Sequence, residues 1–468
     1  MKYFTLFLTT ALLLFVWSSS QGCTIVVIGK DASRDGSVII SHSDGGKDCR
    51  LRVVPRQTFP EGARAPVYWG IQRVDLPLDD MGEVIGHIPQ VRETYRYIHS
   101  SYPHMNEHQL SIGESTMSQR DALKFERKEG DQIMTIEQAQ LFAMQRCKKA
   151  KEAVKLIGRL VEQYGFLPSC IGESECLVVA DPNEAWILEV FSVGPGWERD
   201  SGEPGAIWAA KRVPDDHVTM VPNWSIIKEV DTTQNNCMAS ANYKSFAIEK
   251  GWYDPSGNKP FIWQKAYSPI PREWATGRFW HFYNQYAPEL RNWPDRSIDS
   301  PFDTQNPYVQ YVEDLSIYPF SAKPYRKMGV EDVIDFQRSV FAGTIYDMSE
   351  DPDWYIPGED GKMKKSPLAT PFPTKPMQKL LDITHRRNVA RGGYGMIAQL
   401  RSWLPDAIGG LYWVYEDNQY VGPYVPIYAG VSEINPLYKN YNPDKFDEGS
   451  ARWNYDFVDN LMYLKWQE

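Results

Sequence analysis

A cysteine at residue 23 is the residue whose position could give this chain unusual chemistry. It follows a run from Tyr3 to Trp17 that is apolar except for three threonines, a pattern typical of a secretory leader and too short to span a bilayer comfortably. Ser20 and Gly22 are small residues at the third and first positions before a cleavage site. We therefore predict a signal peptide over residues 1–22, with Cys23 as the first residue of the mature, exported chain.

An N-terminal cysteine would carry a nucleophile and a general base on one residue. Its amine titrates near pH ~8 and its thiol near ~8.5, so the amine can accept the thiol proton at neutral pH. Two alternatives stay open for Cys23. It could form half of a disulfide in an exported protein, or it could be lipidated, although Ser20 stands where a lipidation motif prefers leucine.

Two strands are expected to bring polar side chains back beside this cysteine. Thr24–Gly29 and Ser37–Ser41 are rich in β-branched and apolar residues, and turn-forming residues separate them. A hairpin of these strands would return His42 and Asp44 to Cys23. His42 and Asp44 are therefore candidate site residues, and the alternative is a solvated strand end.

Asn106 is a candidate for stabilising an oxyanion. It lies on a polar turn that enters a strand in which apolar and polar residues alternate, with Leu110 and Ile112 as the apolar members. A side-chain amide held at such a turn could donate to the negative oxygen that develops during acyl transfer. The alternative is an asparagine that stabilises its own turn.

Several separated motifs, in a fixed order, resemble one known family. They are Cys23-Thr24 with Asp35-Gly36-Ser37, Met105–Leu110 with Ile112–Thr116, Val179–Trp186, Arg401–Pro405 and Tyr424–Gly430. On these residues the chain resembles the dipeptidases of peptidase family C69, which are N-terminal nucleophile (Ntn) hydrolases.

This resemblance implies both a fold and an activity. The expected fold is α+β, a four-layer αββα sandwich with two stacked, largely antiparallel sheets, formed by residues 23–468 as a single domain. The implied activity is a secreted cysteine-type dipeptidase that hydrolyses short peptides through an acyl-enzyme on Cys23, without a cofactor. Rival interpretations are an Ntn amidase acting on N-acyl amides and a secreted binding protein that has lost catalysis.

The resemblance also assigns roles to polar residues. It implies Asn106 as the oxyanion donor, Asp44 as the group that orients the α-ammonium, and Asn223 as a second active-site asparagine. Asn223 also begins the only N-glycosylation sequon of the chain, and glycosylation would exclude a buried catalytic role. Many relatives have arginine where His42 stands. Because His42 could replace that arginine only when protonated, we predict a preference for mildly acidic pH.

Composition limits the remaining possibilities. The 468 residues are 42% hydrophobic and 24% charged, with a net charge of −10, which predicts a globular protein whose partners are neither nucleic acid nor an anionic membrane. No segment after the leader is apolar enough to span a bilayer, and the histidines lack the spacing of a metal site. Cys170 and Cys176 are the expected disulfide, and a homo-oligomer is compatible with the sequence.

One long helical region is expected before the central strands. Apolar residues recur at spacings of three and four from Thr135 to Tyr164. Thr135 and Gln138 form a capping-box pattern, and Gly165 is a natural stop. The pair Lys148-Lys149 predicts a break into two helices, which should cover one face of a sheet.

Overall fold

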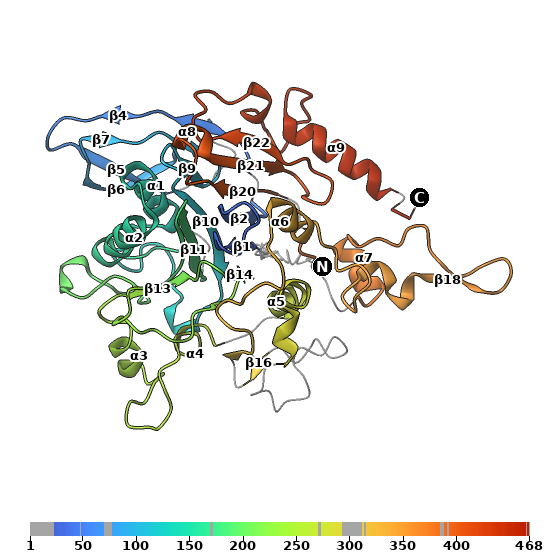
Figure 1. The fold of residues 1–468 in the computed structure, drawn as a ribbon, viewed down its shortest axis with the longest axis horizontal. Coiled ribbons are helices and arrows are strands. Elements are labelled where there is room, and N and C mark those ends of the chain that lie inside the picture. Colours follow the sequence, from blue (N-terminus) through green and yellow to red (C-terminus); the bar gives the residue numbers. More distant parts are fainter. Residues whose placement is uncertain are drawn as a thin grey trace, which may run out of the picture.

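The computed structural model is a mixed α/β protein with two large antiparallel sheets (Figure 1). It describes residues 23–46, 48–69, 77–168, 172–269, 273–292, 311–312, 315–383, 388–390, 393–464 and 466–467. The predicted signal peptide over 1–22 and the predicted disulfide partner Cys170 lie outside these ranges. Cys176 is a buried thiol.

The first sheet contains the predicted hairpin that follows Cys23. Its strands in spatial order are β14 (Val218–Val221), β1 (Ile25–Ile28), β2 (Val38–Asp44), β20 (Tyr394–Leu400), β21 (Gly410–Glu416) and β22 (Val425–Tyr428). Val27 pairs with Ile40 in the hairpin. All four residues of β1 are buried, as expected for a strand that is apolar on both faces.

The second sheet has eight strands, all antiparallel. Their spatial order is β15 (Cys237–Ala239), β13 (Ile207–Val213), β12 (Glu184–Phe191), β11 (Ser174–Asp181), β10 (Ser111–Met117), β9 (Pro103–Asn106), β8 (Tyr97–His99) and β3 (Arg52–Val54). The pair β10 and β9 share only one register position, Ser111 with Met105. The two strands therefore diverge, and side chains fill the space between them.

Two helices cover one face of the eight-stranded sheet. These are α1 (Ile136–Arg146) and α2 (Ala150–Tyr164), with α1 against β9 and α2 against β11, β12 and β13. The Thr135 hydroxyl accepts the Gln138 amide, and Gly165 ends α2 with φ of +69°. The predicted cap by Thr135, the break and the stop are confirmed, whereas Gln138 Oε1 accepts the Tyr68 amide at 3.1 Å and does not complete a capping box.

The opposite face of the eight-stranded sheet meets the six-stranded sheet. Strand β2 contacts β10, β11 and β12, and a continuous apolar core fills the interface. On the other side of the six-stranded sheet, α5 (Glu273–Tyr286) contacts β14, and α6 (Val330–Gln337) contacts β2 and β20. Figure 1 shows α1 and α2 on one side of the paired sheets and α5 and α6 on the other.

The remaining elements lie outside the two large sheets and the four helices described above. The short hairpins are β4 (Gln57–Thr58) with β7 (Glu93–Thr94), β5 (Arg64–Trp69) with β6 (Glu83–Pro89), β16 (Tyr311–Val312) with β17 (Leu315–Ser316), and β18 (Tyr355–Pro357) with β19 (Met363–Lys365). The other helices are α3 (Ser245–Glu249), α4 (Trp263–Tyr267), α7 (Lys375–Leu380), α8 (Asp406–Gly409) and α9 (Ala451–Tyr463). Short 3-10 turns lie at Asp121–Leu123, Arg199–Ser201, Pro288–Asn292, Met348–Glu350, Pro352–Trp354 and Pro436–Tyr438.

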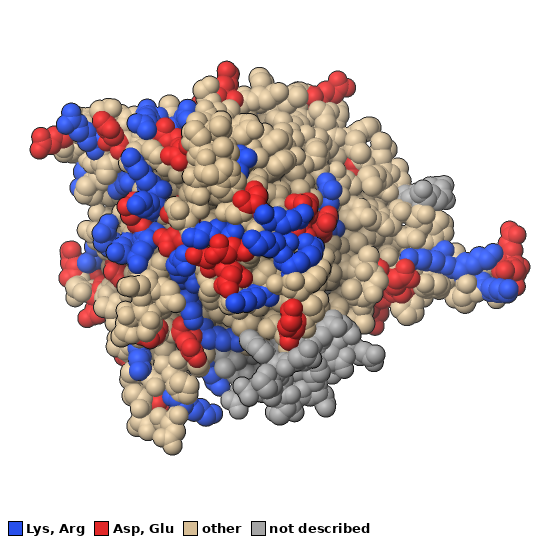
Figure 2. All heavy atoms as spheres, in the orientation of Figure 1, with Lys and Arg blue, Asp and Glu red and all other residues tan. Residues whose placement is uncertain are grey.

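Within the described residues, every helix is too short or too polar to cross a membrane. The surface facing the viewer in Figure 2 carries acidic and basic side chains mixed together. This face therefore presents no extended patch of a single charge.

Candidate active site

The hairpin of β1 and β2 places the Cys23 thiol against the Asp44 carboxylate. Cys23 directly precedes the strand pair, and the backbones of Thr24 and Ser43 exchange hydrogen bonds of 3.3 and 3.2 Å. Cys23 Sγ donates to Asp44 Oδ1 at 3.5 Å, and the Cys23 residue is only 3% exposed. The predicted proximity of Cys23 and Asp44 is confirmed, and a carboxylate at this place can hold a proton or a positive charge beside the sulfur.

A buried arginine from α5 fixes the backbone around the thiol. Arg278 donates from Nη1 to the Cys23 carbonyl at 2.6 Å and to Thr24 Oγ1 at 2.7 Å. Its Nη2 donates to the Pro222 carbonyl at 2.7 Å and to Asn223 Oδ1 at 2.8 Å. The guanidinium therefore joins the start of β1 to the segment that follows β14, and it brings Asn223 into the same group as Cys23.

Arg278 is a residue that our sequence interpretation missed. It stands in the stretch Glu-Trp-Ala-Thr-Gly-Arg-Phe-Trp-His-Phe-Tyr of α5, and it is 3% exposed. An arginine among aromatic residues on a buried helix is unusual, because a charge is buried only where strong acceptors receive it. This arginine within an aromatic helical stretch was the only feature of the sequence that could have pointed to Arg278.

Asn223 occupies a strained backbone position inside the core. Its φ is +64°, a left-handed conformation that asparagine adopts more readily than most residues. The side-chain Nδ2 donates to the Thr116 carbonyl at 2.7 Å, and the residue is 2% exposed. A glycan on Nδ2 would have to break this bond and fill the core, so the fold does not accommodate the glycosylation alternative.

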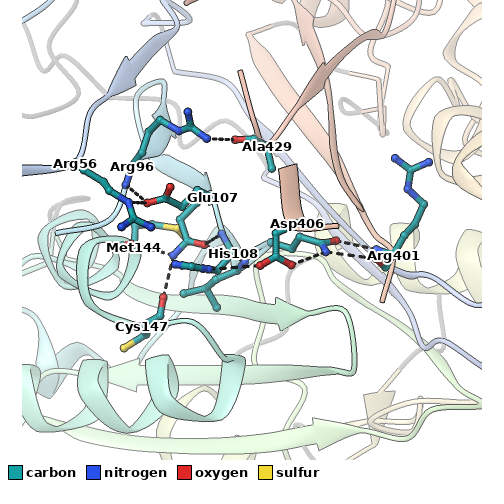
Figure 3. A network of polar contacts seen from close by, with 12 residues as sticks. Arg56, Arg96, Glu107, His108, Met144, Cys147, Arg401, Asp406 and Ala429 are labelled. Atoms are coloured by element: carbon teal, nitrogen blue, oxygen red, sulfur yellow. Dashed lines mark hydrogen bonds and ion pairs between the residues drawn. The ribbon is translucent and has the colours of Figure 1, made fainter. Parts of the chain in front are cut away.

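Asn106 lies in a different environment from the one expected. Its Nδ2 donates to the Met144 and Cys147 carbonyls, both at 2.9 Å, and its Oδ1 accepts the amides of His108 and Leu110 at 3.0 and 3.1 Å. Figure 3 shows Met144 and Cys147 at the end of α1, beside this turn. Since both amide hydrogens are used by helix carbonyls, the side chain has no donor left for an oxyanion. This arrangement is the turn-stabilising alternative, in which Asn106 cannot donate to an oxyanion.

His42 fills the space between the diverging strands β9 and β10. Its Nδ1 lies 3.0 Å from the Glu114 amide nitrogen and 2.7 Å from the Glu114 carbonyl oxygen, so the ring takes the place of a neighbouring strand. The rings of Tyr102, His104 and Tyr394 surround it. Burial lowers the pKa of His42, although Asp44 opposes this shift. The lowered pKa favours the neutral ring over the imidazolium that we expected from the sequence, which is a correction to the sequence interpretation.

Ionisable groups near Asp44 are buried. Burial raises the pKa of Glu114 to about 7; a hydrogen bond with Glu175 opposes the rise, and the charge of Asp44 adds to it. Burial also raises the pKa of Tyr415 well above its usual value, with the Asp44 and Cys23 charges contributing. Electrostatic interactions are strong in such an environment. Across the described part of the chain, no cluster of three or more metal-ligating side chains occurs.

Comparison with known proteins places the chain in a family. The model of peptidase family C69 matches residues 22–468. A probable dipeptidase of Salmonella dublin is 24% identical over 435 residues, covering 88% of this chain and 82% of the relative. A probable dipeptidase of Latilactobacillus sakei is 24% identical over 92% of this chain and 79% of its own length, and a dipeptidase of Bifidobacterium longum is 24% identical over 89% and 73%. The match of nearly the whole chain, starting next to the thiol that Asp44 contacts, shows that the chain belongs to peptidase family C69.

Proposed function

We propose that this peptidase is a secreted dipeptidase whose nucleophile is Cys23, made N-terminal by removal of residues 1–22. The observation that carries the proposal is the 3.5 Å contact of the buried Cys23 thiol with Asp44, in a group braced by Arg278. The names of the relatives supply the substrate class, since those proteins are called dipeptidases. The small-residue pattern before Cys23 supports cleavage at that peptide bond.

The frame around Cys23 supports a four-layer assignment. We take α1 with α2, the eight-stranded sheet, the six-stranded sheet, and α5 with α6 as the successive layers of an αββα sandwich of the Ntn type. The contacts of β2 with β10 and of α6 with β2 support this order. In such a fold the nucleophile opens a central strand and faces the space between the sheets, which fits the place of Cys23 before β1.

The proposed reaction uses one residue as nucleophile and base. The free α-amine of Cys23 takes the thiol proton, and the thiolate attacks the peptide carbonyl carbon. The tetrahedral intermediate collapses to a thioester as the C–N bond breaks, and the protonated amine gives its proton to the leaving amine. Water, deprotonated by the same amine, then hydrolyses the thioester. We assign to Asp44, which contacts the Cys23 thiol, the role of holding the α-ammonium that forms in each half of the cycle.

Residues around the thiol support the charged steps. Arg278 holds a fixed positive charge at the Cys23 carbonyl, and Asn223 keeps Arg278 in place. For the oxyanion, we propose Ser115 together with backbone amides. Its hydroxyl is buried without a hydrogen-bond partner, and it lies on the same face of β10 as Gly113, whose missing side chain lets β2 approach. Thr116, the next residue, is bound by Asn223.

The test is to identify the mature N-terminus and to remove the thiol. The full chain, secreted by a heterologous host, should begin at Cys23 by N-terminal sequencing and should hydrolyse dipeptides. Cys23→Ser should lower kcat/KM at least ~10³-fold, whereas Cys237→Ser, which alters a buried cysteine in β15, should leave it unchanged. A mature chain that starts elsewhere, or an active Cys23→Ser protein, would contradict the mechanism.

The same assay addresses the two rival activities. Faster turnover of N-acyl amides than of dipeptides would favour an Ntn amidase with the same nucleophile. A wild-type protein that binds dipeptides without turnover, and a Cys23→Ser variant that binds them equally well, would indicate a binding protein.

A further inference from the structure

A cavity lies apart from the Cys23 group, on the α1 side of the eight-stranded sheet. Its volume is about 440 Å³, within the range of about 300–1,000 Å³ that is usual for small-molecule sites. The hairpins that follow β3 form one wall, and α1 forms the other. None of its lining residues belongs to β1, β2, β14 or α5, the elements that hold the proposed nucleophile.

The lining of this cavity is more apolar than polar. Leu141 and Phe142 of α1 face Phe59 and Tyr68 of the hairpin region. The buried Tyr97 also lines the cavity, and burial raises its pKa to about 12, so it remains a neutral phenol. A ligand body that fits here would be apolar or aromatic.

A half-buried cation, Arg52, lines this space without a carboxylate of the described residues within ion-pair distance. Arg52 of β3 is half-buried and donates from Nη2 to His99 Nδ1 at 2.8 Å and to Met81 Sδ at 2.7 Å, and from Nε to the same His99 nitrogen at 3.3 Å. Since arginine has only donors, His99 must accept and therefore be neutral. Burial and the charge of Arg52 lower the pKa of His99 well below its usual value, in agreement with a neutral ring.

Two neighbouring arginines have the carboxylate partner that Arg52 lacks. Arg50 is held by both oxygens of Asp48 at 2.8 and 2.9 Å, and Arg56 contacts Glu107 at 2.7 Å. Among the described residues, no carboxylate oxygen lies within 4.0 Å of the Arg52 guanidinium. A charge removed from water is normally paired, because burial without a partner is unfavourable. Burial lowers the pKa of Arg52, the direction expected for a cation without sufficient compensation.

A group without a hydrogen-bond partner belongs to a residue in the wall of the same cavity. Gln145 of α1 lines the cavity, and its Oε1 is buried without a hydrogen-bond partner. This oxygen can accept an N–H from a ligand. Asp79, an exposed residue that also lines the cavity, is the only described acidic residue among its walls. An ammonium group would meet Asp79, whereas an uncharged amide would need only Gln145.

We propose that this cavity is a binding site for a small monocarboxylate with an apolar body and an adjacent N–H group. The carboxylate would form a paired hydrogen bond with Arg52, the geometry that guanidinium groups favour. The N–H would reach Gln145 Oε1, and the apolar body would lie against Leu141 and Phe142. Free apolar amino acids and N-acylated amino acids share this chemistry. The inference does not depend on the proposed dipeptidase activity, although that activity would release the first of these molecules.

Calorimetric titration of the full chain tests the site with three matched probes. They are L-phenylalanine, N-acetyl-L-phenylalanine, and N-acetyl-L-phenylalaninamide, which has no carboxylate. We expect the wild type to bind at least one of the two carboxylates and not the amide. Preference for phenylalanine would indicate that Asp79 binds the ammonium, whereas preference for the N-acetyl compound would indicate the N-acylated source.

Two arginine substitutions at the same cavity test whether the Arg52 guanidinium itself binds the carboxylate or whether any loss of positive charge there weakens binding. Arg52→Met should weaken carboxylate binding at least ~10-fold, the loss expected for a charge-assisted pair. Arg64→Met, which removes an exposed arginine at the rim whose Nη2 donates to the His87 carbonyl, should change binding less than ~3-fold. Dipeptide turnover should be the same in both variants and in the wild type.

Thermal unfolding of the unliganded proteins distinguishes a ligand-binding role of Arg52 from a purely structural role. A structural role would make Arg52→Met unfold at a lower temperature than the wild type. Arg52→Met should unfold at the wild-type temperature or above it, because methionine removes an uncompensated charge from an apolar site. The proposal is overturned if neither carboxylate binds the wild type at millimolar concentration, or if Arg52→Met binds both probes as the wild type does. It is also overturned if Arg52→Met unfolds at a clearly lower temperature while Arg52→Lys, which keeps the charge, restores stability without ligand binding.

Discussion

Removal of the Arg278 guanidinium should affect catalysis far more than the loss of stability alone explains. In Arg278→Met the carbonyls of Cys23 and Pro222, Thr24 Oγ1 and Asn223 Oδ1 all lose the donor that they have in the wild type. At about 1 kcal/mol for each hydrogen bond, the free energy of unfolding should fall by about 4 kcal/mol. With an unfolding entropy of about 2.1 cal/mol/K per residue over about 450 residues, the melting temperature should fall by about 4 °C.

The catalytic effect has a different origin and a different size. Without the guanidinium, the Cys23 carbonyl and Asn223 lose the group that joins them, and the nucleophile can shift from its position in the wild type. A displacement of about 1 Å costs about 100-fold in rate, and the loss of a fixed cation adds to this. We therefore expect kcat to fall at least ~100-fold at 25 °C, where the variant remains folded, with a smaller change in KM.

A matched control is available at the end of α6. Arg338 also donates to two backbone carbonyls, those of Gln419 and Gly422 at 3.1 and 3.0 Å, and it makes no contact with the Cys23 group. Arg338→Met should lower the melting temperature while kcat stays within ~3-fold of the wild type. Steady-state dipeptide hydrolysis and scanning calorimetry on both variants provide the comparison. If Arg278→Met retains kcat, or if both variants lose the same fraction of it, the positioning role of Arg278 is refuted.

Three further outcomes follow from the site. Asn106→Ala should lower the free energy of unfolding in urea by about 2–4 kcal/mol while kcat changes little, because its amide binds helix carbonyls; a ~10²-fold fall in kcat with little loss of stability would instead indicate an oxyanion role. Since the pKa of Glu114 is raised to about 7 in the fold, the folded protein holds this proton more tightly than the unfolded chain does. The wild type should therefore lose up to about 3 kcal/mol between pH 4.5 and 7, a loss that urea titrations of Glu114→Gln should not show. His42→Gln should leave the pH–rate profile below pH ~6.5 unchanged, because the ring is already neutral; a lost acidic limb would show that His42 is protonated in the active enzyme.

Local parts of the site followed from the sequence. The hairpin of β1 and β2 depends on residues close in the chain, so apolar strands and a turn were sufficient to place Asp44 beside Cys23. The cap at Thr135 and the stop at Gly165 are local in the same way. These features were predictable because each depends on a few neighbouring residues rather than on the tertiary fold.

Asn106 shows where local patterns stop being informative. A polar turn before an alternating strand has the same sequence whether its amide points to a substrate or to the end of a helix. The carbonyls that decide between the two belong to Met144 and Cys147, which lie 38 and 41 residues further along the chain. Only the packing of α1 against β9 brings them to the amide.

The sequence also led us to assign the positive charge near the Cys23 thiol to the wrong residue. The resemblance led us to look for a cation at His42, and a histidine there suggested dependence on mild acid. The fold uses that ring as a neutral partner for the β10 backbone, while Arg278, 255 residues from Cys23 in sequence, lies 2.6 Å from its carbonyl. A guanidinium stays charged throughout the accessible pH range. The positive field at Cys23 should therefore be independent of pH, and any pH dependence of turnover should report the α-amine and the thiol themselves.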